Sequence, residues 1–418
     1  MKTLPTGWKK EKLSDYLETV IDYRGKTPAK ADKGILTLSA KSVKMGEIDY
    51  SQAYFISKET YKEFMVRGFP KVGDILMTTE APLGCIAKLD RDDVSVAQRL
   101  LTLRGKEKQL DNDYLMYYLM SPIGQYELLS RASGSTVQGI KRSEFEKIDI
   151  VMPTSYDEQK EIASILSSFD KKIELLKEQN QTLETMAQTI FKEWFVDFNY
   201  PNATVEMIDS EMGEIPKGWR VGRIGDEFDI TIGRTPPRQE SQWFSEVPQG
   251  MKWASIKDMG NAGVYIFNTS EYIVDEAIVK FNIPIIPENT TILSFKMTVG
   301  KVSITTEKML SNEAIAHMKI KKDSYLTSEY IYLFLLNLNF NTLGSTSSIV
   351  TAINTAIIKK IRFLIPDEFS MNNFTNLIIP IFTKIKNNSK QIQTLEETRD
   401  SLLPKLMSGQ KRVFEYDN

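Results

Sequence analysis

The stretch from Ser155 to Phe198 constrains the fold most, because its apolar residues recur at spacings that alternate four and three. This is the 3.5-residue period of a coiled-coil seam. Ser155 and Glu158 form an S-x-x-E capping box at its start, and Pro201 follows its end. A helix of this length reaches roughly 60 Å, so another part of the chain must lie along it. The seam residues are Ile162, Leu166, Phe169, Ile173, Leu176, Asn180, Leu183, Ala187, Ile190 and Trp194.

The same spacing returns near the C-terminus, and each seam contains an asparagine near its middle. We predict that the two helices pair antiparallel, with the asparagines facing each other and fixing the register at a cost in stability. The alternative is two unrelated surface helices, in which both asparagines would be exposed. The second seam consists of Phe374, Ile378, Ile381, Ile385, Asn388, Ile392, Leu395, Arg399, Leu402 and Leu406. The predicted pairs are Asn180 with Asn388, Ile162 with Leu406, and Trp194 with Phe374.

Shorter motifs also occur twice, in the same order in each half of the chain. Single short matches arise by chance, but several in the same order, each set closed by a long helix, do not. The sequence therefore predicts a tandem duplication. The repeated blocks are residues 5–9 with 216–220, 25–28 with 233–236, 134–136 with 344–346, and 181–184 with 393–396.

The composition bounds the class of protein. A chain of 418 residues exceeds what one hydrophobic core organises, so two or three domains are expected. Its 41% apolar and 26% charged residues are typical of a soluble globular protein, and neither a membrane span nor a signal peptide is visible. The one cysteine, Cys85, excludes an internal disulfide and suits the cytoplasm. With a net charge of −2, binding to nucleic acid would need local basic patches or a partner.

Each half mixes short strands with helical spacing, and a last strand runs into a proline before each long helix. The expected fold class is therefore α+β, with two tandem pseudo-symmetric globular domains separated by two long antiparallel coiled-coil helices. Strands are predicted at 35–39, 74–79, 84–89, 100–104, 148–152 and 361–365, and shorter helices at 113–130 and 328–338. The expected boundaries are 1–154 for the first globular domain, 155–199 for the central helix, 200–368 for a linker and the second globular domain, 369–409 for the C-terminal helix, and 410–418 for a tail.

Residues suited to catalysis are scarce. The only histidine, His317, lies in a strand-like run, so no histidine-based triad or metal site can be assembled, and we expect it to be structural. Residues 134–141 approach a phosphate-binding P-loop, but the lysine does not follow the second glycine. The chain also lacks a dinucleotide-binding fingerprint and the Asn-Pro-Pro-Tyr or Asp-Pro-Pro-Tyr motif of amino-group DNA methyltransferases. These residues indicate a binding protein.

Motifs along essentially the whole chain match one family. They are residues 5–8 (PTGW), 22–28 (DYRGKTP), 81–84 (APLG), 134–138 (GSTVQ), 158–162 (EQKEI), 191–198 (FKEWFVDF), 215–219 (IPKGW) and 403–409 (LPKLMSG). With them the chain resembles the specificity subunit of type I restriction-modification systems. The second half departs modestly, at 298–300 and 347–348, and these departures bear only on the choice of contact residues in that half.

The resemblance implies a division of labour. Each globular domain would be a target-recognition domain that reads one half of a split site in double-stranded DNA, and the paired helices would set the unread gap. The chain would dock two methyltransferase subunits, which would carry S-adenosylmethionine and flip the target adenine. A motor-nuclease subunit would join through the complex. This chain would be non-catalytic and cytoplasmic, and it would bind neither cofactor nor metal itself.

Basic and hydroxyl side chains near glycine-containing loops are the candidates for DNA contact. Glycine lets the backbone approach phosphates closely, and arginine can donate two hydrogen bonds to guanine. For each candidate the alternative is a solvated surface charge. Tyr23, Trp243 and Phe244 are candidates for stacking on bases, with core packing as the alternative. The candidate contacts are Arg24, Lys26, Lys41, Lys44, Ser135, Thr136, Lys141, Arg142, Arg234, Thr235, Arg238, Lys257, Lys296, Lys301, Ser345 and Thr346.

Phe195 and Phe198 fall off the helix seam, and we assign them to the methyltransferase interface, with packing against the neighbouring globular domain as the alternative. Two other functions remain to be weighed. A coiled-coil scaffold that does not read DNA would have equivalent, non-basic loops in the two halves. A nuclease with a carboxylate-bound metal would show magnesium-dependent cleavage by the chain alone.

Overall fold

The structure, a computed structural model, is described over residues 4–23, 25–201, 203, 206–343 and 353–413. It contains two compact units, of which the first comprises residues 1–173 and 394–418 and the second residues 174–393. Two long helices, α5 (Tyr156–Phe195) and α11 (Glu368–Met407), contribute residues to both units. Within the described ranges, no helix combines the length and apolar character needed to cross a membrane.

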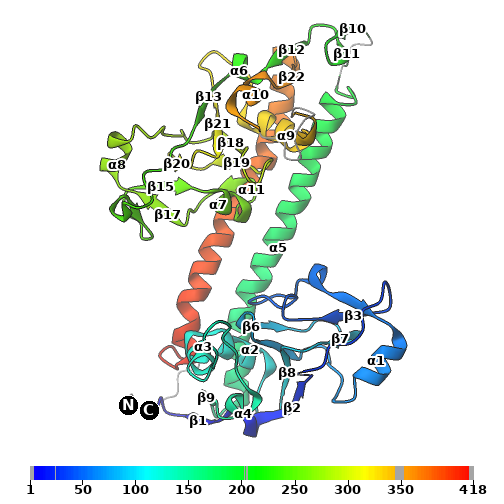
Figure 1. Cartoon of the computed structure of the whole chain (residues 1–418), viewed down its shortest axis with the longest axis vertical. Helices are drawn as coiled ribbons and strands as arrows, with labels where there is room; N and C mark the ends of the chain where they lie inside the picture. Colours follow the sequence, from blue (N-terminus) through cyan, green and yellow to red (C-terminus); the bar gives the residue numbers. More distant parts are fainter. Residues whose placement is uncertain (1–3, 24, 202, 204–205, 344–352, 414–418) are drawn as a thin grey trace. The chain divides into compact units, whose positions relative to one another are not determined.

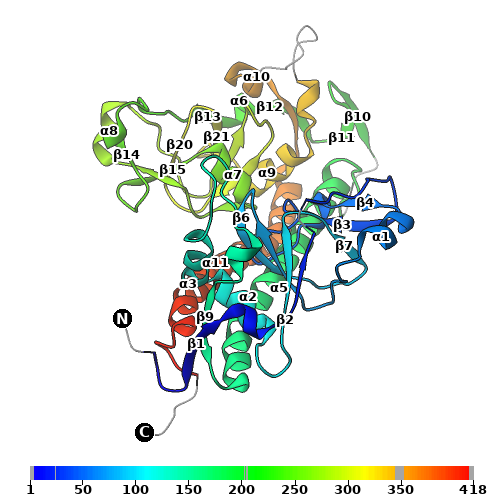
Figure 2. The same cartoon turned by 60° about the horizontal axis from the view of Figure 1, so that its bottom comes forward.

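The first unit is built on a four-stranded sheet in the order β2-β8-β5-β6, a three-stranded sheet in the order β4-β3-β7, and the antiparallel pair β1–β9 (Figure 1). Figure 2 shows α1 beside the three-stranded sheet. The strands are β1 (Trp8–Lys12), β2 (Leu17–Asp22), β3 (Ile35–Leu38), β4 (Tyr54–Ile56), β5 (Ile75–Thr79), β6 (Leu83–Lys88), β7 (Val94–Val96), β8 (Leu100–Gly105) and β9 (Asp149–Pro153). The strands expected from the sequence at these places are thus confirmed.

The prediction of a single helix at 113–130 is wrong, because the segment forms two helices that are separated at Ser121-Pro122. Proline cannot donate a backbone hydrogen bond, so it disfavours a helix interior and is accommodated best in the first turn, where Pro122 begins α3. The Ser121 hydroxyl caps the second helix by accepting the Gly124 N–H at 3.2 Å. The helices of this unit are η1 (Leu13–Tyr16), η2 (Tyr50–Gln52), α1 (Lys58–Phe64), α2 (Asn112–Met120), α3 (Pro122–Leu129) and α4 (Arg142–Phe145).

The second unit repeats this topology and adds one strand to each of the two larger sheets, β16 beside β19 and β14 beside β17. Its sheet order β13-β21-β18-β19 corresponds to β2-β8-β5-β6, its order β17-β15-β20 corresponds to β4-β3-β7, and β12–β22 corresponds to β1–β9. The tandem duplication inferred from short motifs therefore extends to strand pairing. The strands are β12 (Arg220–Arg223), β13 (Phe228–Ile232), β14 (Phe244–Ser245), β15 (Met251–Ala254), β16 (Tyr265–Ile266), β17 (Glu271–Ile273), β18 (Thr291–Ser294), β19 (Val302–Thr305), β20 (Leu310–Ser311), β21 (Ile315–Ile320) and β22 (Arg362–Ile365).

Between α5 and β12, part of the segment expected to be a linker pairs into a hairpin of β10 (Met207–Ser210) and β11 (Gly213–Pro216). The helix expected at 328–338 is present as α9 (Ser328–Asn337). The remaining helices are α6 (Ile224–Glu227), η3 (Ser241–Trp243), α7 (Ile256–Asn261), α8 (Asp275–Lys280), η4 (Phe340–Thr342) and α10 (Thr355–Lys360).

One buried tyrosine plays the same part in each unit. The Tyr114 hydroxyl at the start of α2 donates to the Val151 carbonyl in β9 at 2.9 Å, and the Tyr330 hydroxyl at the start of α9 donates to the Leu364 carbonyl in β22 at 2.6 Å. Both rings are fully buried. A buried phenol must find a hydrogen-bond partner, so this bond fixes the helix against the last strand before the long helix.

The long helices contact each other in antiparallel fashion within each unit. In the second unit the Asn388 amide, 1% exposed, donates to the Asn180 side-chain oxygen at 3.0 Å, and the rings of Trp194 and Phe374 lie 5.6 Å apart. In the first unit Ile162 and Leu406 belong to one buried cluster. These contacts agree with the predicted register and disfavour two unrelated surface helices. The part that the asparagines play in fixing the register stays a prediction.

The start of α5 has the serine half of the expected capping box and an additional ion pair. The Ser155 hydroxyl accepts the Glu158 N–H at 3.3 Å, as expected. The Glu158 carboxylate is fully buried and binds Arg412 of the C-terminal tail at 3.0 Å. Arg412 also donates to the Thr6 carbonyl at 2.8 Å, so one guanidinium joins both chain ends to the first turn of α5.

Candidate nucleic-acid interface

In the first unit, the loop at residues 133–141 is fastened to the tip of the β5–β6 hairpin. Its ends close on each other through backbone hydrogen bonds between Ser133 and Gly139, at 2.9 and 3.0 Å. The Ile140 N–H then donates to the Thr79 carbonyl at the end of β5, at 3.0 Å. The loop and the hairpin tip therefore form one continuous surface element.

Ser135 and Thr136 are exposed at the closed end of this loop. The turn requires glycine at 134, where φ is +111° and an added Cβ would lie 2.2 Å from the Val137 carbonyl oxygen. The glycine of the repeated GST motif thus has a conformational reason in this half. The loop holds two hydroxyls in solvent, where they can donate to phosphate oxygens or base edges.

Exposed lysines surround the same sheet. The turn at residues 41–46 lies against β6, because the Gly46 N–H donates to the Ile86 carbonyl at 2.8 Å. A separate turn follows β2, closed by the Lys26 N–H donating to the Tyr23 carbonyl at 3.1 Å. The exposed lysines among the predicted contacts of this unit are Lys26, Lys41, Lys44 and Lys141.

Arg142 is engaged inside the first unit. Its Nε binds the Glu146 carboxylate at 2.9 Å, and one terminal nitrogen donates to the Val20 carbonyl of β2 at 3.1 Å. The side chain therefore ties α4 to the sheet, and its predicted contact with DNA stays a prediction. Arg24, another predicted contact, lies outside the described residues.

Arg99 was missed by the sequence reasoning. Its Nε binds the Glu80 carboxylate at 2.6 Å, next to the β5–β6 tip, and its φ of +69° is rare for a residue with a side chain. Arg99 is half-exposed, so a cation lies beside the 133–141 loop. No motif marks this position, since its place follows from the pairing of β5 with β8.

In the second unit, polar residues gather around Glu313. The Thr235 hydroxyl donates to the Glu313 carboxylate. Burial alone would raise the pKa of Glu313, but hydrogen bonds, first from Thr235, and the nearby charges of Lys296 and Arg238 lower it on balance. Glu313 is therefore held as an anion that orders a cluster of donors.

Arg238 is committed to intramolecular contacts. Its two terminal nitrogens bind both oxygens of Glu271 at 2.7 and 2.9 Å, and its guanidinium lies over the rings of Phe244 and Trp253 at 4.2 and 4.7 Å. The fork that would read guanine is paired with Glu271 in this structure, and contact of Arg238 with DNA stays a prediction. Phe244 and Trp243 are likewise half-buried in this cluster, and Tyr23 of the first unit is buried, so core packing describes these rings.

The other predicted DNA contacts of the second unit that the structure describes are exposed but differ in their hydrogen bonds within the chain. Arg234 is exposed but donates to the Phe281 carbonyl at 2.6 Å. Lys257 on α7 and Lys301 just before β19 are exposed. Ser345 and Thr346 lie outside the described residues.

A basic pocket of about 720 Å³ opens beside β12 and β22 and was not predicted. Three cations, Arg223, Lys360 and Arg362, line it together with apolar side chains. The lining is completed by Leu338, Thr342, Leu343, Ile357 and Ile361. Such a pocket offers charge for a phosphate group and an apolar wall beside it.

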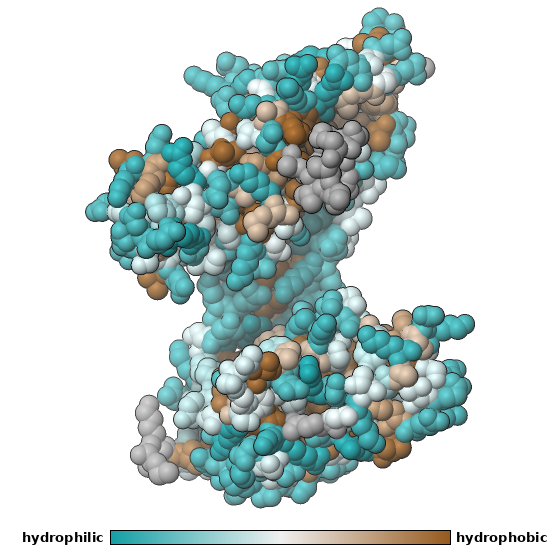
Figure 3. Space-filling model, in the orientation of Figure 1, coloured by the Kyte–Doolittle hydropathy of each residue, from teal (hydrophilic) through white to brown (hydrophobic). Residues whose placement is uncertain are grey.

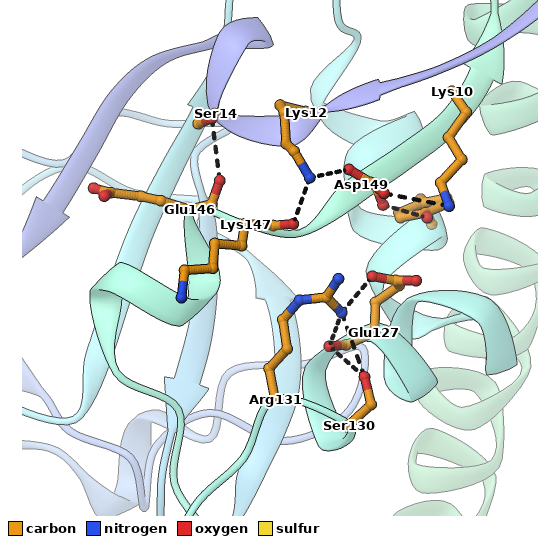
Figure 4. Close-up of polar contacts among 10 residues, drawn as sticks. Lys10, Lys12, Ser14, Glu127, Ser130, Arg131, Glu146, Lys147 and Asp149 are labelled. Atoms are coloured by element: carbon orange, nitrogen blue, oxygen red, sulfur yellow. Dashed lines mark hydrogen bonds and ion pairs between the residues drawn. The ribbon is translucent and has the colours of Figure 1, made fainter.

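In the corresponding strand pair of the first unit, a carboxylate binds two lysines (Figure 4). Lys12 and Lys10 both bind Asp149, at 2.5 and 3.2 Å, and the Lys12 hydrogen bond is the main cause that lowers the pKa of Asp149. Arg131 is also paired, with Glu127. Asp149 faces Lys12 across the strands, whereas Arg362 faces Arg223 in the second unit. A position-by-position comparison of the two repeats in the sequence would have revealed the excess of cations at this pocket.

Phe195 lies in the core of the second unit, 6% exposed. Its ring centroid is 4.7 Å from that of Phe374, 4.9 Å from that of Tyr330 and 5.6 Å from that of Trp219. This burial corrects the assignment of Phe195 to a subunit interface, and intramolecular packing describes it. Phe198 is half-buried against Trp219, and its assignment to an interface stays a prediction.

No metal cluster is found among the described residues: nowhere do three or more His, Cys, Asp or Glu side chains group to hold an ion. His317 is fully buried in β21, between the hydroxyls of Ser311, at 2.7 Å, and Thr231, at 2.9 Å. Burial first, and then Lys319, lowers the pKa of His317 to about 3. The imidazole is thus a neutral structural group, as the sequence suggested.

Comparison with known proteins gives a consistent result. Residues 5–185 and again 216–397 match the family described as the type I restriction modification DNA specificity domain. The type I restriction enzyme MjaIX specificity subunit of Methanocaldococcus jannaschii is 30% identical over 371 residues, covering 86% of this chain and 82% of the relative. The type I restriction enzyme HindI specificity subunit of Haemophilus influenzae is 24% identical over 405 residues, covering 81% of this chain and 87% of the relative.

A solved structure is also similar. The crystal structure of the type I restriction-modification system S subunit from M. genitalium aligns with a TM-score of 0.59 and 14% sequence identity, and the alignment covers 97% of each chain. At this identity the similarity concerns the fold.

Proposed function

Because this chain belongs to the family of type I restriction-modification specificity subunits, which are non-catalytic and recognise DNA sequence, we propose that it reads a bipartite site in double-stranded DNA, one half with each globular unit. The single observation that supports this most is the double match, at 5–185 and 216–397, mirrored in two sheets of the same strand order. Two similar readers with different loop residues suit two different half-sites.

The long helices act as the spacer in this proposal. Each contains 40 residues, or roughly 60 Å at 1.5 Å per residue. As an antiparallel coiled coil they would hold the two target-recognition domains apart. The buried Asn180–Asn388 contact supports a defined register, which a ruler needs. The unread gap between the half-sites would then have a constant length.

Exposed lysines and hydroxyls of both units supply the DNA contacts. Lys26, Lys41, Lys44 and Lys141 in the first unit, and Lys257 and Lys301 in the second, would meet phosphates, whereas Ser135 and Thr136 sit where hydroxyls reach phosphate or base edges. Since the net charge of the chain is only −2, these local patches and the partner subunits would share the electrostatic work.

The chemistry would belong to the partners. Two methyltransferase subunits would dock on the chain, bring S-adenosylmethionine and take the target adenine out of the stack, and a motor-nuclease subunit would join the complex in the cytoplasm. This chain would choose the site and hold the subunits on it.

The test is a map of modified adenines, by long-read sequencing, in cells that carry the methyltransferase subunit with or without this chain. We expect a split motif with a constant gap to be methylated only when the chain is present. Replacing residues 1–155 by those of another family member should change one half of the motif and leave the other half and the gap unchanged. A methylation pattern indifferent to the chain would refute DNA reading and favour a scaffold.

A further inference from the structure

Met297 stands at the tip of the β18–β19 hairpin with 97% of its side chain exposed. It is the most exposed large apolar residue among those that the structure describes. Figure 3 shows hydrophilic residues over much of the face drawn, with hydrophobic ones scattered among them. Single exposed apolar residues are common on protein surfaces, so what sets Met297 apart is its near-complete exposure at a hairpin tip. Met297 makes no contribution to the core that would explain an apolar residue here.

The hairpin holds this tip in one conformation. The Ser294 hydroxyl donates to the Thr298 carbonyl at 2.6 Å and accepts the Lys301 N–H at 3.0 Å. The Gly300 N–H donates to the Ser294 carbonyl at 2.9 Å. Met297 is therefore presented on a closed loop, which reduces the entropy that would be lost if it entered a binding partner.

The backbone at the tip does not explain the methionine either. Met297 has a φ of +59°, and Ala81 at the corresponding position of the β5–β6 hairpin has a φ of +55°. In that hairpin the Cys85 N–H donates to the Thr78 hydroxyl at 2.8 Å, as Lys301 does to Ser294. Both halves thus impose a left-handed conformation that glycine or asparagine adopts more readily. What distinguishes the second half is a long apolar side chain at that point.

The charges around the tip indicate what it meets. Lys296 and Lys301 are both exposed on either side of Met297. At the corresponding places the first hairpin has Glu80, which is paired with Arg99, and the neutral Cys85. Duplex DNA has charged phosphates on the outside and apolar stacked bases inside. An apolar tip between two cations is complementary to that arrangement.

On this basis, and resting on the proposed function, we propose that Met297 inserts between two adjacent base pairs of the half-site read by the second unit. Lys296 and Lys301 would bind the phosphates on either side of the opened step. Insertion of an apolar wedge unstacks a step and kinks the duplex, and the cost is lowest at flexible pyrimidine–purine steps. The second unit would then select sequence partly through deformability, whereas the first, with Ala81 at its tip, would not.

The experiment uses the full chain with its methyltransferase subunits and a duplex that carries the mapped motif. 2-Aminopurine, which pairs with thymine, replaces one adenine at a time on either strand in and beside the second half-site, avoiding the methylated adenine. Its fluorescence rises when it is unstacked. Three variants are compared with the unaltered chain: Met297→Ala, the conservative Met297→Leu, and Val279→Ala as a control. Val279 is 83% exposed on α8 of the same unit, so its truncation removes a comparable exposed apolar group.

We expect one step to show raised fluorescence with the unaltered chain, Met297→Leu and Val279→Ala. Met297→Ala should abolish that signal and weaken specific binding about tenfold, while binding to unrelated DNA is unchanged. Wild-type fluorescence and affinity in Met297→Ala would overturn the proposal. So would a loss of methyltransferase co-purification with unchanged DNA binding, since the tip would then contact protein. Failure of the unaltered chain to bind any motif would instead refute the proposed function itself.

Discussion

The two units share a topology but differ in the charges that face each other across their first strand pair. In the first unit Lys12 is opposite Asp149, and in the second Arg223 is opposite Arg362. The buried tyrosine that fastens the neighbouring helix is the same in both. At these positions the two units share the packing residue and differ in the surface pair. Surface positions that do not contribute to the fold are therefore where the two units can differ in function.

A second difference lies inside the sheets. His317 of the second unit pairs with Thr231 and Ile292, and Thr102 of the first unit pairs with Ile21 and Leu76 in the corresponding strands. Both side chains are buried, but only the imidazole can take up a proton in the pH range in which proteins are usually studied. The two units should therefore respond differently to acid.

The largest expected effect concerns Phe195, whose ring is central only to the second unit. Phe195→Ala should lower the free energy of unfolding of that unit by about 3–5 kcal/mol, because it removes a buried ring from an aromatic cluster. Urea denaturation of the full chain measures this, and Phe198→Ala, at a half-buried ring, should cost less. Unchanged stability together with a lost methyltransferase complex would return Phe195 to the interface.

The next effect is the acid response of His317. Its pKa is about 3 in the folded state, mainly through burial, and near 6.5 when unfolded, so below pH 6.5 the unfolded state binds the proton first. The free energy of unfolding should therefore fall by about 1.4 kcal/mol per pH unit between about pH 6 and pH 4. This stability is fully present above pH 6.5.

His317→Thr, which copies the first unit, is the matched variant for this response. It removes the imidazole hydrogen bonds with Ser311 and Thr231 and should be less stable at pH 7, but its unfolding free energy should depend less steeply on pH. If the unfolding free energies of the two proteins fall equally steeply from pH 7 to pH 4.5, the imidazole is not held neutral in the folded state.

The smallest effect concerns the basic pocket. Under the proposed function, Arg362→Asp gives the second unit the charge pattern of the first, and the slope of log affinity against log salt should fall by about 1 for each phosphate that the variant no longer binds. The existing Arg362–Glu211 pair, at 2.9 Å, is exposed and therefore contributes little. DNA binding titrations at several salt concentrations provide the measurement.

Lys12→Ala in the first unit is the control, because Lys12 faces a carboxylate, Asp149, across the strand pair, whereas Arg362 faces a second cation, Arg223. We expect the control to change the salt slope less than Arg362→Asp does. Equal slopes in the unaltered chain and in Arg362→Asp would show that the pocket does not meet the DNA backbone. The charge difference between the two strand pairs would then serve folding or binding to a protein partner.

Much of the architecture was determined by the sequence alone, because it rests on local or repeated patterns. The 3.5-residue period predicted both long helices, the two asparagines predicted a register that agrees with the Asn180–Asn388 contact, and the duplicated motifs predicted two equivalent units. The proline at 122, within an otherwise helical pattern, was the local signal that was overlooked.

Only the tertiary structure decided which side chains are available to a partner. Arg142 and Arg238 looked like free cations but are paired with Glu146 and Glu271, and Phe195 looked like a surface residue but is buried. The exposure of Met297 had no signal in its own motif. The physical reason is that pairing and burial depend on neighbours that are distant in the chain, whereas periodicity and capping depend on residues within a few positions.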